Sequence, residues 1–170
     1  KILSAITSMG KLPDGEYTLS FRLFGGNIDG EVNRVKTINV STPTSVNLIY
    51  PGGSLSDTTQ NVIYTPYPIF QWSTETCFSC ELFIRVAEFN PAFHNSLEDA
   101  IEDITSCPVN QTQGWETIGN TSFQYPITGA KELEEGKLYV WQIKKEFQTT
   151  LGIESYLSSI SIFKIAKVSI

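Results

Sequence analysis

The chain has 170 residues, 41% of them hydrophobic and 12% aromatic, which is enough to bury a core in one large domain or in one complete and one partial domain. Its formal net charge of −6 argues against nucleic acid and against an anionic membrane surface as partners, because binding to phosphate groups needs clustered Lys and Arg. No apolar run approaches the length of a membrane-spanning helix, and the share of charged residues, 18%, is typical of β-rich extracellular proteins.

The N-terminal segment, residues 1–42, predicts strands that do not complete a domain. Apolar and polar residues alternate from 17 to 23, as in a half-buried strand, and residues 32–40 form a second strand rich in Val and Ile. Two or three strands make a poor independent core, so we expect their apolar face to be covered by residues further upstream or by another chain. The residues predicted to take part in this interaction are Tyr17, Leu19, Phe21 and Leu23.

A complete domain is predicted over residues 43–170, after a linker at 41–44. Residues 54–68 are polar and contain two prolines, which suits a loop or an edge strand. The last segment, 158–170, alternates but changes phase near Phe163, which suggests a bulge or a strand that continues past its sheet. The other strands are indicated at 46–50, 69–73, 82–87, 122–126 and 137–147.

One short amphipathic helix is predicted inside this domain, crossing between the sheets. Ser96-Leu97-Glu98-Asp99 resembles a capping box, and apolar residues follow at helical spacing up to Ile104. The acidic residues of this segment do not have the spacing of a calcium-binding loop, so we expect them to form a solvated outer face. They are Glu98, Asp99, Glu102 and Asp103.

Three cysteines, Cys77, Cys80 and Cys107, leave one thiol over however they pair. In an oxidising compartment we expect a disulfide from Cys80 or Cys77 to Cys107. A redox role would need the Cys-x-x-Cys motif at the start of a helix, and no helical pattern follows it. A zinc site that adds His94 to the three sulfurs has a ligand spacing unlike common structural zinc sites. We therefore predict no metal and no cofactor.

The densest structural signal is Leu133-x-x-Gly136-x-x-Tyr139, a tight corner that leads into a central strand with Trp141 on the same face as Tyr139. Trp72 lies on an earlier strand in the same alternating pattern. We expect these five residues to form the structural core, covered by a second sheet.

Trp72 followed by this corner and Trp141 resembles a fibronectin type III or related immunoglobulin-like module over about residues 43–166. The segment from Phe89 to Gly114 departs from that pattern, since it holds the predicted helix where the family has a short connection. The resemblance implies an all-β, immunoglobulin-like (fibronectin type III-like) β-sandwich with one short inserted helix. Residues 1–42 similarly resemble a partial immunoglobulin-like set of strands. The amino-acid sequences of the strands are also similar to those of modules in secreted and surface proteins of Gram-negative bacteria. This similarity implies a bacterial extracellular or cell-surface location.

Catalysis is not predicted, because the chain has a single histidine and no motif that brings an acid, a base and a nucleophile together. The resemblance implies binding, spacing or assembly and carries no catalytic residues. We therefore expect a non-catalytic structural or adhesive module whose partners are copies of itself or adjoining modules, and which forms a surface filament if strands are shared head to tail.

The alternative is a carbohydrate-binding module of a secreted multidomain protein, with glycan as the partner. Sandwich modules bind sugars on exposed aromatic platforms, and four aromatic residues fall in predicted edges or loops. They are Tyr64, Tyr67, Trp115 and Tyr156, of which Tyr67 and Trp115 are the stronger candidates for interaction.

Overall fold

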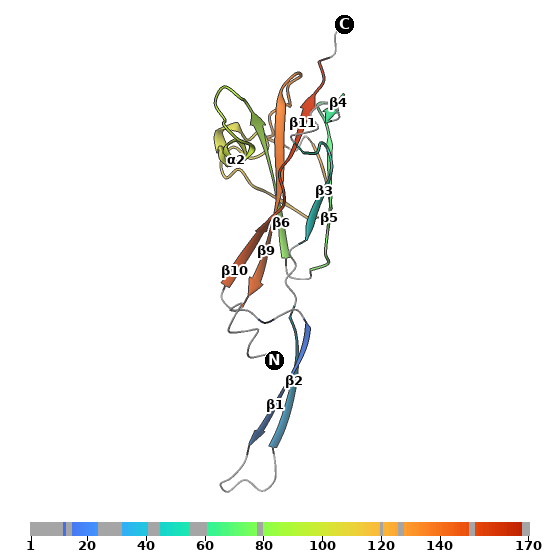
Figure 1. The fold of residues 1–170 in the computed structure, drawn as a ribbon, viewed down its shortest axis with the longest axis vertical. Helices are drawn as coiled ribbons and strands as arrows, with labels where there is room; N and C mark the ends of the chain where they lie inside the picture. The colour runs from blue at the N-terminus through green and yellow to red at the C-terminus, as the bar shows by residue number, and fades with distance from the viewer. Residues whose placement is uncertain are drawn as a thin grey trace. The chain divides into compact units, whose positions relative to one another are not determined.

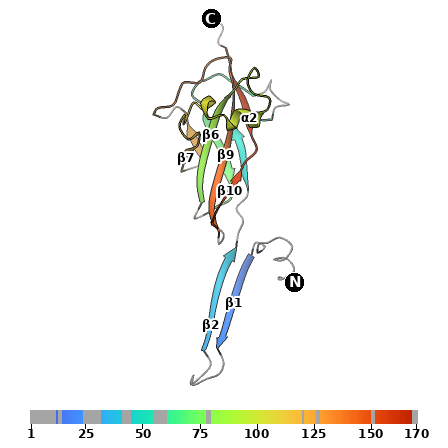
Figure 2. The same cartoon turned by 90° about the vertical axis from the view of Figure 1, so that its left-hand side faces the viewer.

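A computed structural model of the chain describes residues 12, 15–23, 32–40, 45–54, 61–77, 80–119, 121–125, 128–149 and 152–167. It divides into two separately packed units, Lys1–Pro43 and Thr44–Ile170, which are drawn in Figures 1 and 2. Strands predominate in both units, so the predicted all-β class is confirmed. The predicted linker, 41–44, lies outside the described residues.

The first unit contains one antiparallel pair of strands, β1 (Gly15–Leu23) and β2 (Val32–Val40). Both strands are where the alternation and the Val and Ile content predict them. In the described part of this unit the sheet has only these two strands, and we call it the β1–β2 ribbon.

The second unit contains two sheets that lie in separate layers (Figure 1). The smaller sheet has three antiparallel strands in the order β3-β5-β8. They are β3 (Val46–Tyr50), β5 (Ile69–Thr74) and β8 (Ser122–Gln124).

The larger sheet has the order β4-β11-β9-β6-β7, and β10 pairs with the far half of β9 on the same side as β11. Its contacts are antiparallel except for the edge pair of β4 with β11, which is parallel. Because β4 falls within residues 54–68, the edge strand predicted there is present. The six strands are β4 (Val62–Ile63), β6 (Cys80–Phe89), β7 (Glu116–Ile118), β9 (Leu138–Thr149), β10 (Gly152–Leu157) and β11 (Ser161–Ile165).

The main core lies between the two sheets. Phe70 contributes from β5 and contacts Trp141 and Phe163 edge to face, with ring centroids 5.1 and 5.8 Å apart. Such T-shaped pairs are favoured by the ring quadrupoles as well as by burial. Of the residues singled out from the sequence, Trp72, Leu133, Tyr139 and Trp141 are all at most 3% exposed.

The corner before β9 is closed by hydrogen bonds. The Tyr139 hydroxyl accepts a bond from the Glu134 N–H at 2.8 Å, so the ring is tied back to the turn that precedes it. Gly136 has φ +80°, a conformation that favours glycine, and its N–H donates to the Ile165 carbonyl at 2.8 Å. The corner therefore joins the start of β9 to the end of β11.

Helix α2 (Leu97–Glu102) forms where the capping motif predicts it, with the Ser96 hydroxyl accepting from the Asp99 N–H. The predicted crossing between the sheets is wrong, because α2 packs on the outer side of β6 and β9 (Figure 2). Ile104 was expected on its buried face but lies in the following 3-10 turn, η2 (Ile104–Ser106), and is 40% exposed.

This helix creates a second core cluster on the outer face of the larger sheet. As a result, β11 is buried on both faces. Ile162 packs in the cluster with α2, whereas Phe163 and Ile165 pack in the main core. The phase change near Phe163 therefore reflects burial on two sides, and the predicted bulge is wrong, since β11 pairs with β9 in unbroken register. Residues 168–170, where the strand was predicted to continue, lie outside the described residues.

Candidate functional site

The β1–β2 ribbon exposes an apolar face. In the antiparallel register Tyr17 is opposite Ile38, and residues directly opposite each other point to the same side of the sheet. Phe21 is 58% exposed, Leu19 41% and Ile38 38%, so two of the residues predicted to interact, Leu19 and Phe21, are largely exposed, whereas Tyr17 is half-buried. Leu23 ends β1, but its side chain lies outside the described residues.

Two cations share this apolar face. Lys36 is opposite Leu19 and Arg34 is opposite Phe21, and both are exposed. The one carboxylate of β1, Glu16, is opposite Asn39 and points to the other side. Among the described side chains, the face thus combines apolar groups with positive charge only.

The four aromatic residues predicted to form a sugar platform are not brought together. Tyr64 follows β4 and Trp115 precedes β7, and these are the two outer strands of the larger sheet. Tyr156 packs against the main core, and only Tyr67, at 48%, and Tyr64, at 82%, are largely exposed. The topology therefore places Tyr64 and Trp115 at opposite edges of the larger sheet and does not support a platform shared by all four residues.

Trp115 is instead covered by two cations. The Arg85 guanidinium lies 4.3 Å and the Lys144 ammonium 5.1 Å from the centre of its ring. Arg85 also donates to the Ile101 carbonyl at 3.0 Å, which links β6 to the helix. Trp115 therefore serves to hold the α2 segment against the sheet through cation–π contacts.

His94 lies beside Asp103 and Ser106, a combination that resembles a catalytic arrangement. The Asn90 N–H donates to His94 Nδ1 at 3.0 Å, so the ring proton is on Nε2, which is 3.3 Å from the Asp103 carboxylate. The Ser106 hydroxyl donates to Asp103 at 2.7 Å. The imidazole therefore has no free acceptor nitrogen for the Ser106 hydroxyl, so His94 cannot take up the proton of that hydroxyl. The hydrogen bonds among His94, Asp103 and Ser106 instead stabilise the segment around α2.

Asp103 is the centre of this network. Hydrogen bonds from the side chains of Thr105 and Ser106 hold the pKa of its carboxyl group well below the ordinary range, and the contact with His94 acts in the same direction. The carboxylate also caps η2 by accepting from the Thr105 N–H at 2.9 Å.

A polar depression of about 240 Å³ lies between the corner and η2. Lys137 is at its rim, where its ammonium group is 2.9 Å from both Glu88 and Glu134, and these hydrogen bonds raise its pKa. Cys107 also lines the depression, but burial raises the pKa of its thiol to about 11. An ion-paired ammonium group and a protonated thiol are poor nucleophiles near neutral pH.

The disulfide joins Cys77 to Cys80, with Cα atoms 5.5 Å apart, and Cys107 is a buried free thiol. The predicted link to Cys107 is therefore wrong. Cys80 starts β6, whereas Cys107 packs in the cluster that contains Ala87, seven residues further along that strand. At about 3.3 Å per residue this separation is roughly 23 Å, far more than a disulfide can bridge.

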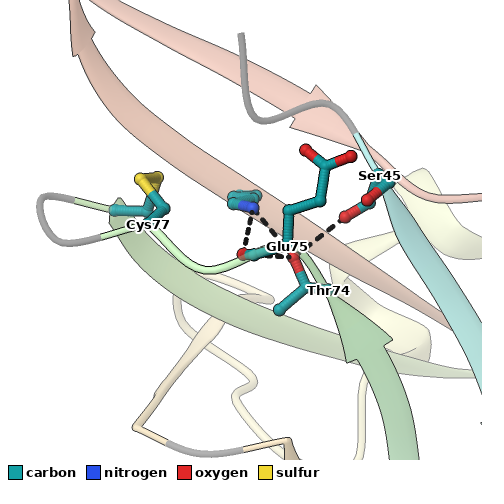
Figure 3. Close-up of a disulfide and its surroundings, with 6 residues drawn as sticks. Ser45, Thr74, Glu75 and Cys77 are labelled. Carbon is teal, nitrogen blue, oxygen red and sulfur yellow. Dashed lines mark hydrogen bonds between the residues drawn. A yellow bond between two sulfur atoms is a disulfide. The ribbon is translucent and has the colours of Figure 1, made fainter. Parts of the chain in front are cut away.

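A lysine that the sequence analysis missed lies near this disulfide. Lys145 is 1% exposed, and its ammonium group donates to the Thr74 hydroxyl at 2.8 Å and to the Glu75 carbonyl at 3.1 Å. The Thr74 hydroxyl in turn donates to the Ser45 carbonyl, and Figure 3 shows this chain of bonds beside Cys77. Burial lowers the pKa of Lys145. The signal was present in the sequence, since Lys145 is in phase with the inward-facing Tyr139 and Trp141 of the same strand.

Among the residues that the structure describes, no three His, Cys, Asp or Glu side chains lie close enough to hold a metal ion. Within the same part of the chain, none of the helices has the length and apolar character needed to cross a bilayer.

Comparison of the chain with protein-family models, with curated proteins and with solved structures found no match.

Proposed function

We propose that the chain is a non-catalytic structural or adhesive module of a secreted or surface protein, and that the β1–β2 ribbon joins it to another copy of itself. The observation that carries this proposal is the uncovered apolar face of the ribbon. A two-stranded ribbon is at best marginally stable in water, whereas a third strand or a covering layer supplies the missing burial. A sheet edge that lacks a partner is also the usual place where one chain adds strands to another.

Charge supports a second copy as the occupant. The chain carries a net charge of −6, whereas the apolar face of the ribbon presents Arg34 and Lys36. Two ribbons stacked on each other would bring like charges together, while a ribbon placed against the acidic remainder of a neighbouring copy would pair opposite charges. Such a contact is head to tail and, repeated, would produce a filament.

We also propose that residues 43–170 form a fibronectin type III-like β-sandwich. Three observations support it. First, β3, β5 and β8 form one sheet and the other strands of this unit form the second. Second, the corner before β9 is closed by the hydrogen bond from the Glu134 N–H to the Tyr139 hydroxyl. Third, Trp72 is buried in the core. A disulfide is compatible with an extracellular location.

The test is the mass of the full chain in solution over a range of concentrations. We expect the unmodified protein to associate reversibly, and Phe21→Lys to remain a monomer of 18.9 kDa because it places a third charge on the apolar face. Val35→Lys is the matched control, since Val35 is 63% exposed but points to the opposite side of the ribbon. A protein that stays monomeric at every concentration, or equal effects of the two substitutions, would contradict the proposal.

A further inference from the structure

The outer face of the three-stranded sheet carries no charged side chain among the described residues. The pairing of β3 with β5 is irregular between Leu48 and Tyr50, where Ile49 is 60% exposed. In β5 the side chains of Phe70 and Trp72 point into the core, so their neighbours point outward. The register places Gln71 between Tyr50 of β3 and Ser122 of β8. We call this surface the neutral face, and its residues, all exposed, are Asn47, Tyr50, Ile69, Gln71, Ser73, Ser122 and Gln124.

The absence of charge here is unusual for this chain. In the part of the chain that the structure describes, no Lys, Arg, Asp or Glu side chain is on the neutral face. The outer side of the larger sheet differs, since Lys144 and Glu146 form an ion pair there and Arg85 stacks on Trp115. The neutral face therefore suits a ligand that is itself polar and uncharged.

Its side chains offer the contacts that such a ligand requires. The amides of Asn47 and Gln71 and the hydroxyls of Ser73 and Ser122 can each donate and accept hydrogen bonds. Tyr50 adds an aromatic ring that is 40% exposed. Along β5 from Ile69 to Ser73 the face extends about 13 Å, and across its three strands about 10 Å, which is room for several sugar rings.

The backbone beside the aromatic residues of this face is anchored before any ligand binds. The carbonyl of Pro51, next to Tyr50, accepts bonds from the Trp141 indole at 2.9 Å and the Ser161 hydroxyl at 3.2 Å. Tyr67 lies at the margin of the face, 48% exposed, and its carbonyl accepts from the Gln124 amide at 3.3 Å. An anchored backbone has little conformational entropy left to lose on binding, which favours recognition of a weakly binding ligand.

We propose that the neutral face binds a neutral polysaccharide, with Tyr50 stacking on a sugar ring and Gln71 and Ser122 bonding to its hydroxyl groups. Acidic glycans and nucleic acids find no cation here, and a purely apolar partner would leave the amides without bonds. This site is separate from the assembly surface proposed above, because its residues belong to the sandwich and not to the β1–β2 ribbon.

The experiment is affinity electrophoresis of the full chain in gels that contain soluble neutral polysaccharides: xyloglucan, galactomannan, arabinoxylan or dextran. We expect at least one of them to retard the protein. Tyr50→Ala should weaken that binding by about tenfold or more through loss of the ring, while Tyr50→Phe should retain most of it. Gln71→Ala should also weaken binding without touching the buried core.

Tyr64→Ala is the matched control, because Tyr64 is 82% exposed but follows β4, at the edge of the other sheet. It should bind as the unmodified protein does. Lack of retardation in all four polysaccharides, or an equal loss in Tyr64→Ala, would overturn the proposal. So would a change in solution mass on Tyr50→Ala, which would mark the neutral face as a contact between copies of this chain.

Discussion

At the scale of single residues, the cysteines give the most direct test of the structure. Cys107 is 1% exposed and its thiol has a raised pKa, about 11, so it should not react with a thiol reagent at pH 8 in the native protein. We expect no reactive thiol in the native, unreduced chain, one in denaturant, and three after reduction. A disulfide-linked peptide that contains Cys107 would contradict the pairing of Cys77 with Cys80.

This pairing also limits how much the disulfide stabilises the fold. It closes a ring of only four residues, so the chain-entropy model gives about 2 kcal/mol. A longer link was expected from the sequence, because it would tie the loop that holds the Cys-x-x-Cys motif to the segment before Pro108. Spacing alone could not reveal that the two segments lie far apart along β6.

Asp103 predicts a dependence of stability on pH. Its folded-state pKa is lower than the value of about 3.9 for an unfolded chain, so the carboxylate stabilises the fold above that pH. This contribution is lost as the pH falls through the folded-state pKa. We therefore expect Asp103→Asn to be less stable than the unmodified protein at pH 6, with a difference that shrinks between pH 4 and pH 2 in urea unfolding.

Glu98→Gln is the control for this series, since Glu98 is exposed in the first turn of α2 and makes no contribution to the Asp103 network. Its difference from the unmodified protein should change less with pH. A pH-independent difference for Asp103→Asn would show that the hydrogen bonds of Thr105 and Ser106 do not depend on the charge of the carboxylate.

At the scale of elements, the loop after β3 depends on a glycine. Gly52 has φ +87°, and a Cβ atom there would overlap the carbonyl oxygen of Ile162 in β11. The adjacent Gly53 exchanges two backbone hydrogen bonds with Ile162, at 3.0 and 3.2 Å, so the loop cannot move away from the strand. Gly52 thus marks a close approach of two backbones as well as a turn.

We expect Gly52→Ala to cost on the order of 3 kcal/mol or more in the free energy of unfolding, through strain and overlap together. Gly129→Ala separates the two effects, because Gly129 has φ +86° but nothing within 4 Å of the added Cβ. It should cost about 1 kcal/mol from backbone strain alone. Equal losses in urea unfolding would show that the loop relaxes away from β11.

The elements differ in how far the sequence determined them. A strand with one buried face, such as β5, was predicted well because alternation reports burial on a single side. The capping motif located α2, but its partner was missed, since the helix packs on a sheet face that the sequence could not identify. Because the covering helix was not foreseen, a bulge was wrongly predicted in β11. Burial of β11 on both sides, and not a bulge, disturbs the alternation there.

The candidate binding surfaces show the same limit. The apolar face of the β1–β2 ribbon could be predicted because its residues alternate along one strand. The neutral face could not, because it combines one row of residues from three strands that are far apart in the chain, and pairing in register is what brings Tyr50, Gln71 and Ser122 together. The predicted aromatic platform is not supported for the converse reason, since the positions of four aromatic residues in the sequence carry no information about which edge each occupies.

At the scale of the whole molecule, the two units differ in what holds them together. Every buried apolar residue in the described part of the chain lies between Val46 and Ile165, and both core clusters belong to the second unit. The described strands of the first unit are joined by the backbone ladder of the β1–β2 ribbon, and the apolar side chains exposed on them are those of Leu19, Phe21, Val35 and Ile38. The free energy of folding should therefore come almost entirely from residues 44–170.

This difference predicts the behaviour of the separate parts. At low concentration, where copies do not associate, residues 44–170 alone should unfold in urea with the same midpoint as the full chain. Residues 1–43 alone should show no cooperative transition by circular dichroism, because the two described strands, without a covering layer, bury too little apolar surface to offset the loss of chain entropy. A lower midpoint for residues 44–170 would mean that the ribbon packs on the sandwich of its own chain. A cooperative transition in residues 1–43 would mean that the ribbon folds without a partner, and either result would remove the physical need for the contact between copies.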